Sequence, residues 1–237
     1  MLPVYYDLHI HTALSPCAND DMTPNDIVGM ALINGLDLIA VTDHNSVSNA
    51  QAVVGAAAGK ELIVLPGVEV STAEEVHVLC LFSDPETALS FEAELSSYYS
   101  PIKNRIDIFG NQILLDKNDC VKGEEERMLI APTTISFDRL YQLVHEHGGA
   151  FIPAHLDRDS FSVLSNLGFL PPDLTIGTLE VSSRGFEKGF DKLNPELFEN
   201  HKIVVSSDAH QLWVISEKEH FLMLPELTAK AAIDYLQ

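Results

Sequence analysis

Histidines and acidic residues recur at the ends of short apolar runs throughout this chain. One residue separates His9 from His11, and one separates Asp208 from His210. Because residues two apart on a β-strand share a face, each pair would present two ligand atoms to one point. Imidazole together with carboxylate suits Zn, Mn or Fe better than Ca or Mg. The spacing therefore predicts a site for divalent metal ions.

The candidate ligands are too many for one ion. In chain order they are His9, His11, His44, Glu69, His77, His155, Asp208 and His210. One tetrahedral site takes four ligands, so the set predicts more than one ion. Paired ions ~3.5–4 Å apart hold the attacking and leaving oxygens of phosphoryl or carbonyl transfer. Each signal is weak alone, because a lone Glu69 is typical of a surface carboxylate, and the prediction depends on the joint placement.

Seven predicted strands position these residues. They are Val4–Ile10, Leu36–Val41, Leu62–Leu65, Val76–Phe82, Gly149–Pro153, Ile176–Val181 and Ile203–Val205. Most are almost continuously apolar, as buried parallel strands are. Proteins of the α/β class place active sites at the carboxyl ends of such strands, where the candidate ligands stand.

Predicted helices alternate with these strands. They cover residues 27–34, 47–59, 87–99, 137–147, 194–200 and 225–236. The alternation indicates a parallel sheet, open or closed. A β-hairpin insertion is expected at about residues 105–130, with extended segments at 107–110, 112–116 and 121–122 and a turn at 117–119. It would cover the mouth of a barrel or form an interface. We expect residues 1–237 to form one domain.

Composition restricts the classes of partner. The chain has 237 residues, with 14 Lys and Arg against 35 Asp and Glu, a formal net charge of −21. Broad contact with duplex DNA or anionic lipid needs clustered cations, so neither is an expected partner. No apolar run approaches the ~18 residues of a membrane span. Three cysteines and a strand that starts almost at Met1 predict a cytoplasmic protein without a disulfide framework. The oligomeric state stays open.

Five motifs together resemble the polymerase-and-histidinol-phosphatase (PHP) phosphoesterase family. They are Asp7-Leu8-His9-Ile10-His11-Thr12, Val41-Thr42-Asp43-His44, Gly67-Val68-Glu69, Pro153-Ala154-His155 and Ser207-Asp208-Ala209-His210. The resemblance implies a distorted (β/α)₇ barrel of the TIM-like type with up to three metal ions. It assigns one ion to His9, His11, Glu69 and Asp208, a second to His44 and His210, and a third to Glu69, His77 and His155.

One departure from the family pattern concerns the second ion. Many members carry Ser-Asp-Gly shortly after the first motif, and that Asp is a ligand. Here the chain reads Ser15-Pro16-Cys17-Ala18-Asn19-Asp20-Asp21. Asp20, Asp21 or the Cys17 thiolate could complete the ligand set, and we expect Asp20.

The resemblance and the ligand set predict metal-dependent hydrolysis of a phosphomonoester or small nucleotide by a bridging hydroxide. We expect the reaction centre to consist of His9, His11, Glu69, Asp208 and His210. Arg158 and Arg184 follow predicted strands and are candidates for binding phosphate, although surface arginines are an equal alternative. Asp43 is expected to orient the His44 imidazole.

Three alternative functions stay open. The first is an exonuclease on short oligonucleotides, although no basic track with interleaved aromatic residues is evident. The second is an amidohydrolase-type barrel, which often needs a bridging lysine that residues 80–84 do not offer. The third is a non-catalytic, metal-binding regulatory barrel, which the nearly complete ligand set argues against.

Overall fold

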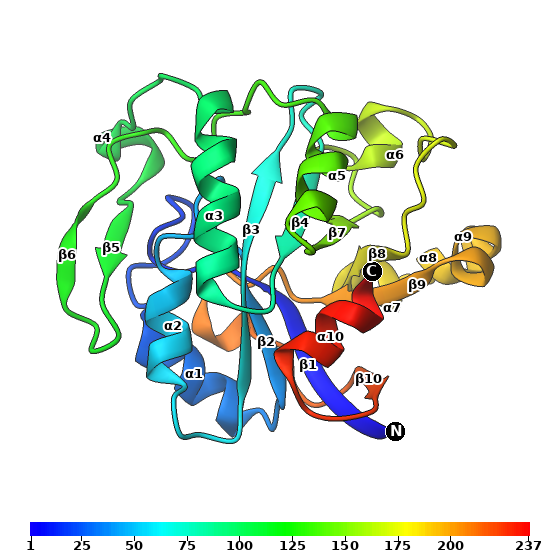
Figure 1. The fold of residues 1–237 in the computed structure, drawn as a ribbon, viewed down its shortest axis with the longest axis horizontal. Helices are drawn as coiled ribbons and strands as arrows, with labels where there is room; N and C mark the ends of the chain where they lie inside the picture. The colour runs from blue at the N-terminus through cyan, green and yellow to red at the C-terminus, as the bar shows by residue number, and fades with distance from the viewer.

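A curled, mixed β-sheet forms the centre of the structure, a computed structural model that describes residues 1–237. Its strands, in spatial order, are β10 (Phe221–Leu224), β1 (Leu2–Ile10), β2 (Leu38–Val41), β3 (Ile63–Ser71), β4 (His77–Leu81) and β7 (Ala150–Pro153). The pairs β1·β2 and β2·β3 are parallel. Strand β4 is antiparallel to β3 and to β7, and β10 is antiparallel to β1. Figure 1 shows β1, β2 and β3 side by side.

A second, two-stranded parallel sheet continues the curl. It consists of β8 (Thr178–Ser182) and β9 (Lys202–Ser206). The Leu156 N–H donates to the Glu180 carbonyl at 2.9 Å, which joins the end of β7 to β8. The Ala209 N–H donates to the His9 carbonyl at 3.0 Å, and the His11 N–H donates to the Ala209 carbonyl at 2.9 Å. Individual hydrogen bonds thus span both junctions between the two sheets.

The sheet differs from the expected parallel (β/α)₇ barrel in three respects. Strands β3 and β4 are separated by only residues 72–76, and a parallel connection needs about a dozen residues, so β4 must run antiparallel. Strand β10 lies in a segment where no strand was predicted. The ladders form two sheets rather than one continuous ring. The shared feature is a mixed α/β fold with a strongly curled sheet.

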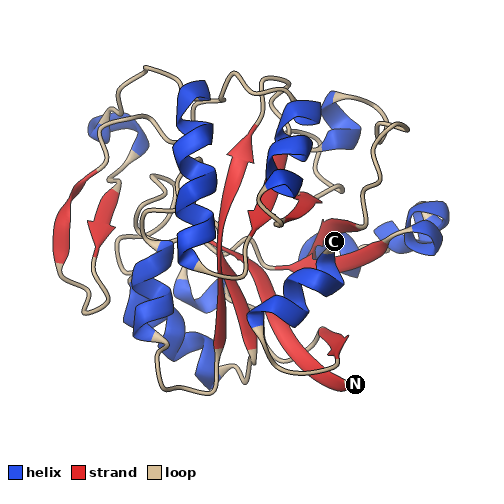
Figure 2. Cartoon of the chain, in the orientation of Figure 1, coloured by secondary structure: helices blue, strands red, loops and turns tan.

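The five longest helices lie where helices were predicted. They are α1 (Pro24–Ile33), α2 (Ala50–Ala56), α3 (Pro85–Leu95), α5 (Phe137–Glu146) and α10 (Ala229–Leu236). Thr23 and Ser136 accept hydrogen bonds from backbone N–H groups of the first turns of α1 and α5, as N-caps do. Figure 2 shows α3 and α5 lying over the strands. No helix combines the length and the apolar content that a membrane crossing requires.

Several short helices complete the chain. They are α4 (Ile106–Phe109), α6 (Val163–Asn166), α7 (Ser183–Glu187), α8 (Phe190–Leu193), α9 (Pro195–Asn200) and the 3₁₀ turns Ser96–Tyr98 and Leu212–Val214. The segment 107–110 was predicted to be extended, and this prediction is wrong because residues 107–109 belong to α4. Except for α9 and the turn at 96–98, these elements lie outside the predicted helices, since one helical turn carries too little periodicity to detect.

Two apolar clusters fill the two sides of the curled sheet. The outer cluster lies between the sheet and α1, α2, α3 and α5, and includes the paired rings of Phe82 and Phe91 at 4.9 Å. The inner cluster combines strand residues such as Leu8 and Leu79 with Ile233 and Leu236 of α10. The concave interior is therefore filled with apolar side chains at the end where α10 packs.

The predicted hairpin is confirmed as β5 (Ile113–Leu115) and β6 (Val121–Glu124), which pair antiparallel. It lies at the edge of the molecule beside α1 and α2 (Figure 1). The Asn49 side chain bonds both ends of β5, through its Oδ1 to the Leu115 N–H and its Nδ2 to the Ile113 carbonyl, each at 2.9 Å. The Ile113 N–H donates to the Ala13 carbonyl at 2.8 Å. These bonds fasten the hairpin to the loop that follows β1.

Candidate metal centre

Glu69, on β3, is a buried carboxylate in contact with five imidazoles. Their nearest nitrogens lie 2.8–3.5 Å from its oxygens, at His44 Nδ1, His77 Nδ1, His155 Nε2, His9 Nε2 and His11 Nε2. The side chain is only 1% exposed. One carboxylate with this many imidazole neighbours can bridge more than one cation.

Asp208 forms a second close group with the first histidine pair. Its Oδ1 lies 3.2 Å from the Nε2 atoms of both His9 and His11, and these two nitrogens lie 3.1 Å apart. Two ligands about 2.1 Å from one tetrahedral ion are separated by about 3.4 Å, so the triangle has nearly the spacing of one coordination sphere.

The hydrogen bonds behind the two rings fix which nitrogen carries the proton. His9 Nδ1 lies 3.0 Å from a Glu180 carboxylate oxygen, which accepts its proton. The Ser15 hydroxyl donates to Asp43 at 2.7 Å, so His11 Nδ1, 2.9 Å from Ser15 Oγ, is the donor of that bond. In the neutral form of each ring the Nε2 atom thereby keeps its lone pair, which is the form that binds metals.

Buried carboxylate oxygens without hydrogen bonds are a second reason to expect a cation at this centre. Glu69 Oε2 and Asp208 Oδ1 are buried and receive no hydrogen bond. Buried acceptors without hydrogen-bond partners are costly. A divalent cation among these atoms would satisfy them all.

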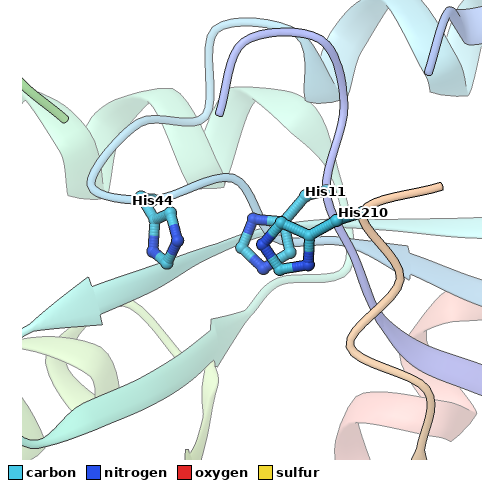
Figure 3. Close-up of side chains that lie close together, drawn as sticks. All are labelled: His11, His44 and His210. Atoms are coloured by element: carbon cyan, nitrogen blue, oxygen red, sulfur yellow. The ribbon is translucent and has the colours of Figure 1, made fainter. Parts of the chain in front are cut away.

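Two further groups of ligand atoms adjoin this triangle. His11, His44 and His210 form one, with the His11 ring centred 4.6 Å from His44 and 4.1 Å from His210. Figure 3 shows these three rings gathered in one place from separate segments. His44, Glu69 and His77 form the other. The eight predicted ligands other than Asp20 are thus brought together.

The electrostatics of the centre favour charged carboxylates. Burial alone would raise the pKa of Glu69, but the imidazoles of His77 and His9 hold it well below its usual range. Burial likewise opposes ionisation of Asp208, and His9 and His11 overcome it, so its pKa is also well below the usual range. Both carboxylates are therefore anionic at neutral pH.

The first histidine pair faces inward because β1 contains an irregularity. Between Asp7 and Ile10 the register with β2 shifts by one residue. Up to Leu8, alternate residues of β1 face the inner cluster, whereas Ile10 joins the outer one. The extra residue turns His9 and His11 into the interior, as β-bulges re-aim side chains beside active sites.

Other ligands reach the interior by strand alternation or by unusual backbone. Glu69 and Leu65 share a face of β3, as His77 and Leu79 share a face of β4, with the apolar partner in the inner cluster. His155 and Asp208 have positive φ angles of 33° and 53°. Residues other than glycine rarely adopt such angles, and those that do concentrate at functional sites.

A known protein family matches most of this chain. The model of the PHP domain family matches residues 7–167, more than half of the chain. The chain belongs to the PHP family. No curated protein sequence matches it significantly.

Solved structures share the fold of this PHP chain at low sequence identity. Endonuclease Q from Pyrococcus furiosus matches 99% of the chain with a TM-score of 0.69 and 17% identity, and the chain covers 56% of that protein. A putative metal-dependent phosphoesterase from Bifidobacterium adolescentis matches 98%, with a TM-score of 0.61, 19% identity and 94% of its own length covered. An amidohydrolase from Chromobacterium violaceum matches 94%, with a TM-score of 0.62, 18% identity and 93% covered. Fold likeness therefore does not separate these chemistries.

These matching structures do not support the expectation that duplex DNA is excluded as a partner. One matching structure is endonuclease Q in complex with a 27-mer duplex substrate that carries an abasic lesion. That protein shares 17% identity with this chain, and the chain covers 50% of it. Net charge describes the whole surface and does not decide what one cavity of a PHP protein accepts.

Asp20 does not join the metal centre of this PHP domain. It is exposed, and its carboxylate accepts a hydrogen bond from Asn111 of the hairpin segment at 2.8 Å. Cys17 is exposed as well, and no group of candidate ligand atoms includes it. Desolvation of its thiol would raise the pKa, but the imidazoles of His44 and His210 lower it to about 7.

Two residues behind the ligands were missed or misassigned from sequence. Glu180 was not predicted to act, yet it contacts His9 and accepts the His155 backbone N–H at 3.0 Å. Its signal was a carboxylate inside the apolar run of β8. Asp43 was expected to orient His44. Its carboxylate instead binds Ser15 and Thr12, so it supports His11 through Ser15.

Replacement of Glu180 by Gln tests this support. Carboxylates behind metal-binding imidazoles contribute about 10–100-fold to metal affinity. We expect Glu180→Gln to weaken zinc binding by that factor, measured by competition with a chromophoric chelator. Glu199→Gln, an exposed change on α9, is the matched control. Unchanged zinc affinity in Glu180→Gln would contradict the role.

A cavity of about 890 Å³ adjoins the metal centre of the PHP domain. Arg158 and Arg184 both line it, as does Lys188. The Arg158 guanidinium also contacts Asp208 at 2.5 Å, so the cavity and the centre share a boundary. The structure thus brings together the two arginines that the sequence suggested as phosphate ligands.

Proposed function

We propose that this PHP chain is a metal-dependent phosphoesterase that hydrolyses a small phosphomonoester or nucleotide. The observation that carries the proposal is the contact between Arg158, on a cavity lined by three cationic and three acidic side chains, and Asp208 of the metal centre. An anionic substrate in that cavity would lie beside the buried carboxylates and imidazoles. We take residues 1–237 as one domain of this type.

The proposed centre holds two or three Zn, Mn or Fe ions. His9, His11, Glu69 and Asp208 would hold one ion, His44 and His210 a second, and Glu69, His77 and His155 a third. When bound, such ions lower the pKa of an attacking water and neutralise charge on a phosphoryl group.

The protein's own residues orient the reaction. Glu180 and Ser15 fix the rings of His9 and His11 with their Nε2 atoms directed at Asp208. Arg158 is the donor closest to the centre and can form two parallel hydrogen bonds with phosphate oxygens. Arg184 is exposed on the same cavity and would bind the remote part of the substrate. These groups position the phosphorus for in-line displacement.

A mixed substrate panel tests the proposal. Protein reconstituted with Mn or Zn is incubated with phosphomonoesters, nucleotides, short oligonucleotides and duplex DNA, and the products are separated. We expect the wild-type protein to release inorganic phosphate from a small ester. His9→Ala should release none, while its far-UV circular dichroism stays native. Mononucleotides or nicked duplex as the main product would replace this proposal with a nuclease. Metal binding without turnover of any substrate would favour the regulatory alternative.

A further inference from the structure

Asp7, on β1, is a fully buried carboxylate that the proposed reaction does not use. It belongs to no group of candidate ligand atoms, and no ion pair includes it. A buried carboxylate without a cation is costly unless hydrogen bonds satisfy its oxygens. The donors that satisfy Asp7 therefore indicate what the carboxylate does.

These donors come from the two ends of one segment, residues 207–216, which follows β9 and is called the 207–216 loop. Ser207 donates its hydroxyl to Asp7 Oδ2 at 2.5 Å and its N–H to Oδ1 at 3.2 Å. The Ser216 N–H donates to Oδ2 at 2.9 Å. One carboxylate thus connects the first and the last residue of the loop.

The 207–216 loop carries parts of the metal centre and of the cavity beside it. Asp208 and His210 are candidate ligands, and Ser207 and Val214 line the cavity. The positive φ of Asp208, 53°, is costly for a residue other than glycine and persists only where surrounding contacts enforce it. The bonds of Ser207 to Asp7 are such contacts, because they fix the residue directly before Asp208.

We propose that Asp7 is a positioning residue that holds Asp208 and His210 at the metal centre and Val214 on the cavity wall. The inference rests on the metal centre of the proposed function and not on its reaction. Asp7 acts through both ends of the 207–216 loop. Its Oδ1 also lies 3.4 Å from the His9 backbone N–H, so the carboxylate relates the loop to the first histidine pair.

Asp7→Asn tests this role at nearly constant volume. An amide offers one oxygen and one NH₂ group, so one of the backbone N–H groups of the loop must face another donor. We expect faster hydrogen–deuterium exchange in residues 207–216 but not in α3. Zinc affinity, measured by competition with a chromophoric chelator, should fall about 10-fold. Asp37→Asn is the matched control, because Asp37 accepts the Tyr5 N–H of the same strand at 2.9 Å, and it should change neither result.

Ser207→Ala keeps the test decisive if Asp7→Asn does not fold. Ser207 is only partly buried, and the change removes one hydrogen bond to Asp7. It should shift both measurements in the same direction by a smaller amount. Because both changes act through one contact, the double variant should bind zinc no more weakly than Asp7→Asn.

Three results would overturn the inference. They are unchanged zinc affinity in Asp7→Asn or, where that variant does not fold, in Ser207→Ala; additive losses in the double variant; and exchange that becomes faster evenly along the chain, which would show a merely structural role. Weaker zinc binding with local exchange in 207–216, in a protein that hydrolyses no phosphoester, supports the inference and counts against the proposed function alone.

Discussion

Glu69→Gln should remove both metal binding and phosphoester hydrolysis while leaving the fold intact. The carboxylate contacts five imidazoles and is 1% exposed, so its charge is the main neutralising group of the centre. Glutamine has nearly the same volume but cannot bridge cations. A loss of several kcal/mol of transition-state stabilisation corresponds to a decrease in kcat/KM of at least about 10³-fold.

The measurement combines kinetics with metal analysis. Bound metal per chain is determined after dialysis, and kcat/KM is determined on the best substrate of the panel. Glu124→Gln, an exposed change on β6, carries the same loss of one charge and should keep both values. Full metal content in Glu69→Gln would show that this carboxylate does not bind metal.

Metal removal should lower the free energy of unfolding of the protein by an amount set by the affinity of the centre for the metal ion. The candidate ligands come from β1, from β3 and from the segments after β7 and β9, so bound ions would connect the two sheets. A few hydrogen bonds otherwise span the β9 to β1 and β7 to β8 junctions. Free metal at about 1,000 times its Kd stabilises a folded protein by about 4 kcal/mol.

Urea unfolding of apo-protein and zinc-loaded protein measures this difference. We expect zinc to raise the free energy of unfolding of wild type by about 4 kcal/mol at that excess and that of Glu69→Gln by much less. Calcium is the control for loose binding to a surface of net charge −21, since it prefers all-oxygen sites. Equal stabilisation of wild type and Glu69→Gln by zinc would place the ions elsewhere.

The sequence predicted the ligands well because they are local features of strand ends. His9, Glu69 and Asp208 each follow an apolar run, and the curl of the sheet brings such ends together. The direction of β4 was also available in principle, since the predicted strands left only residues 66–75 between them and a parallel crossover needs about a dozen residues. The segment was interpreted as one of a parallel set because its composition is that of a buried strand.

The parts that sequence reasoning missed depend on contacts between distant segments. Asp20 lies away from the centre, where its carboxylate accepts a hydrogen bond from the distant Asn111. Glu180 is recognised as a partner of His9 only when the curl of the sheets brings the side chains of β8 and β1 together in space. Residue type and spacing carry no information on either choice.

The apolar side chains that fill the concave interior restrict the route by which substrate enters the site and products leave it. Leu8, Leu79 and the α10 residues Ile233 and Leu236 close the side below the ligands, so solvent reaches them from the side of Arg158. A reactant and its products must then pass through the same opening. Released phosphate occupies the place that the next molecule needs, and turnover is coupled to how quickly that anion departs.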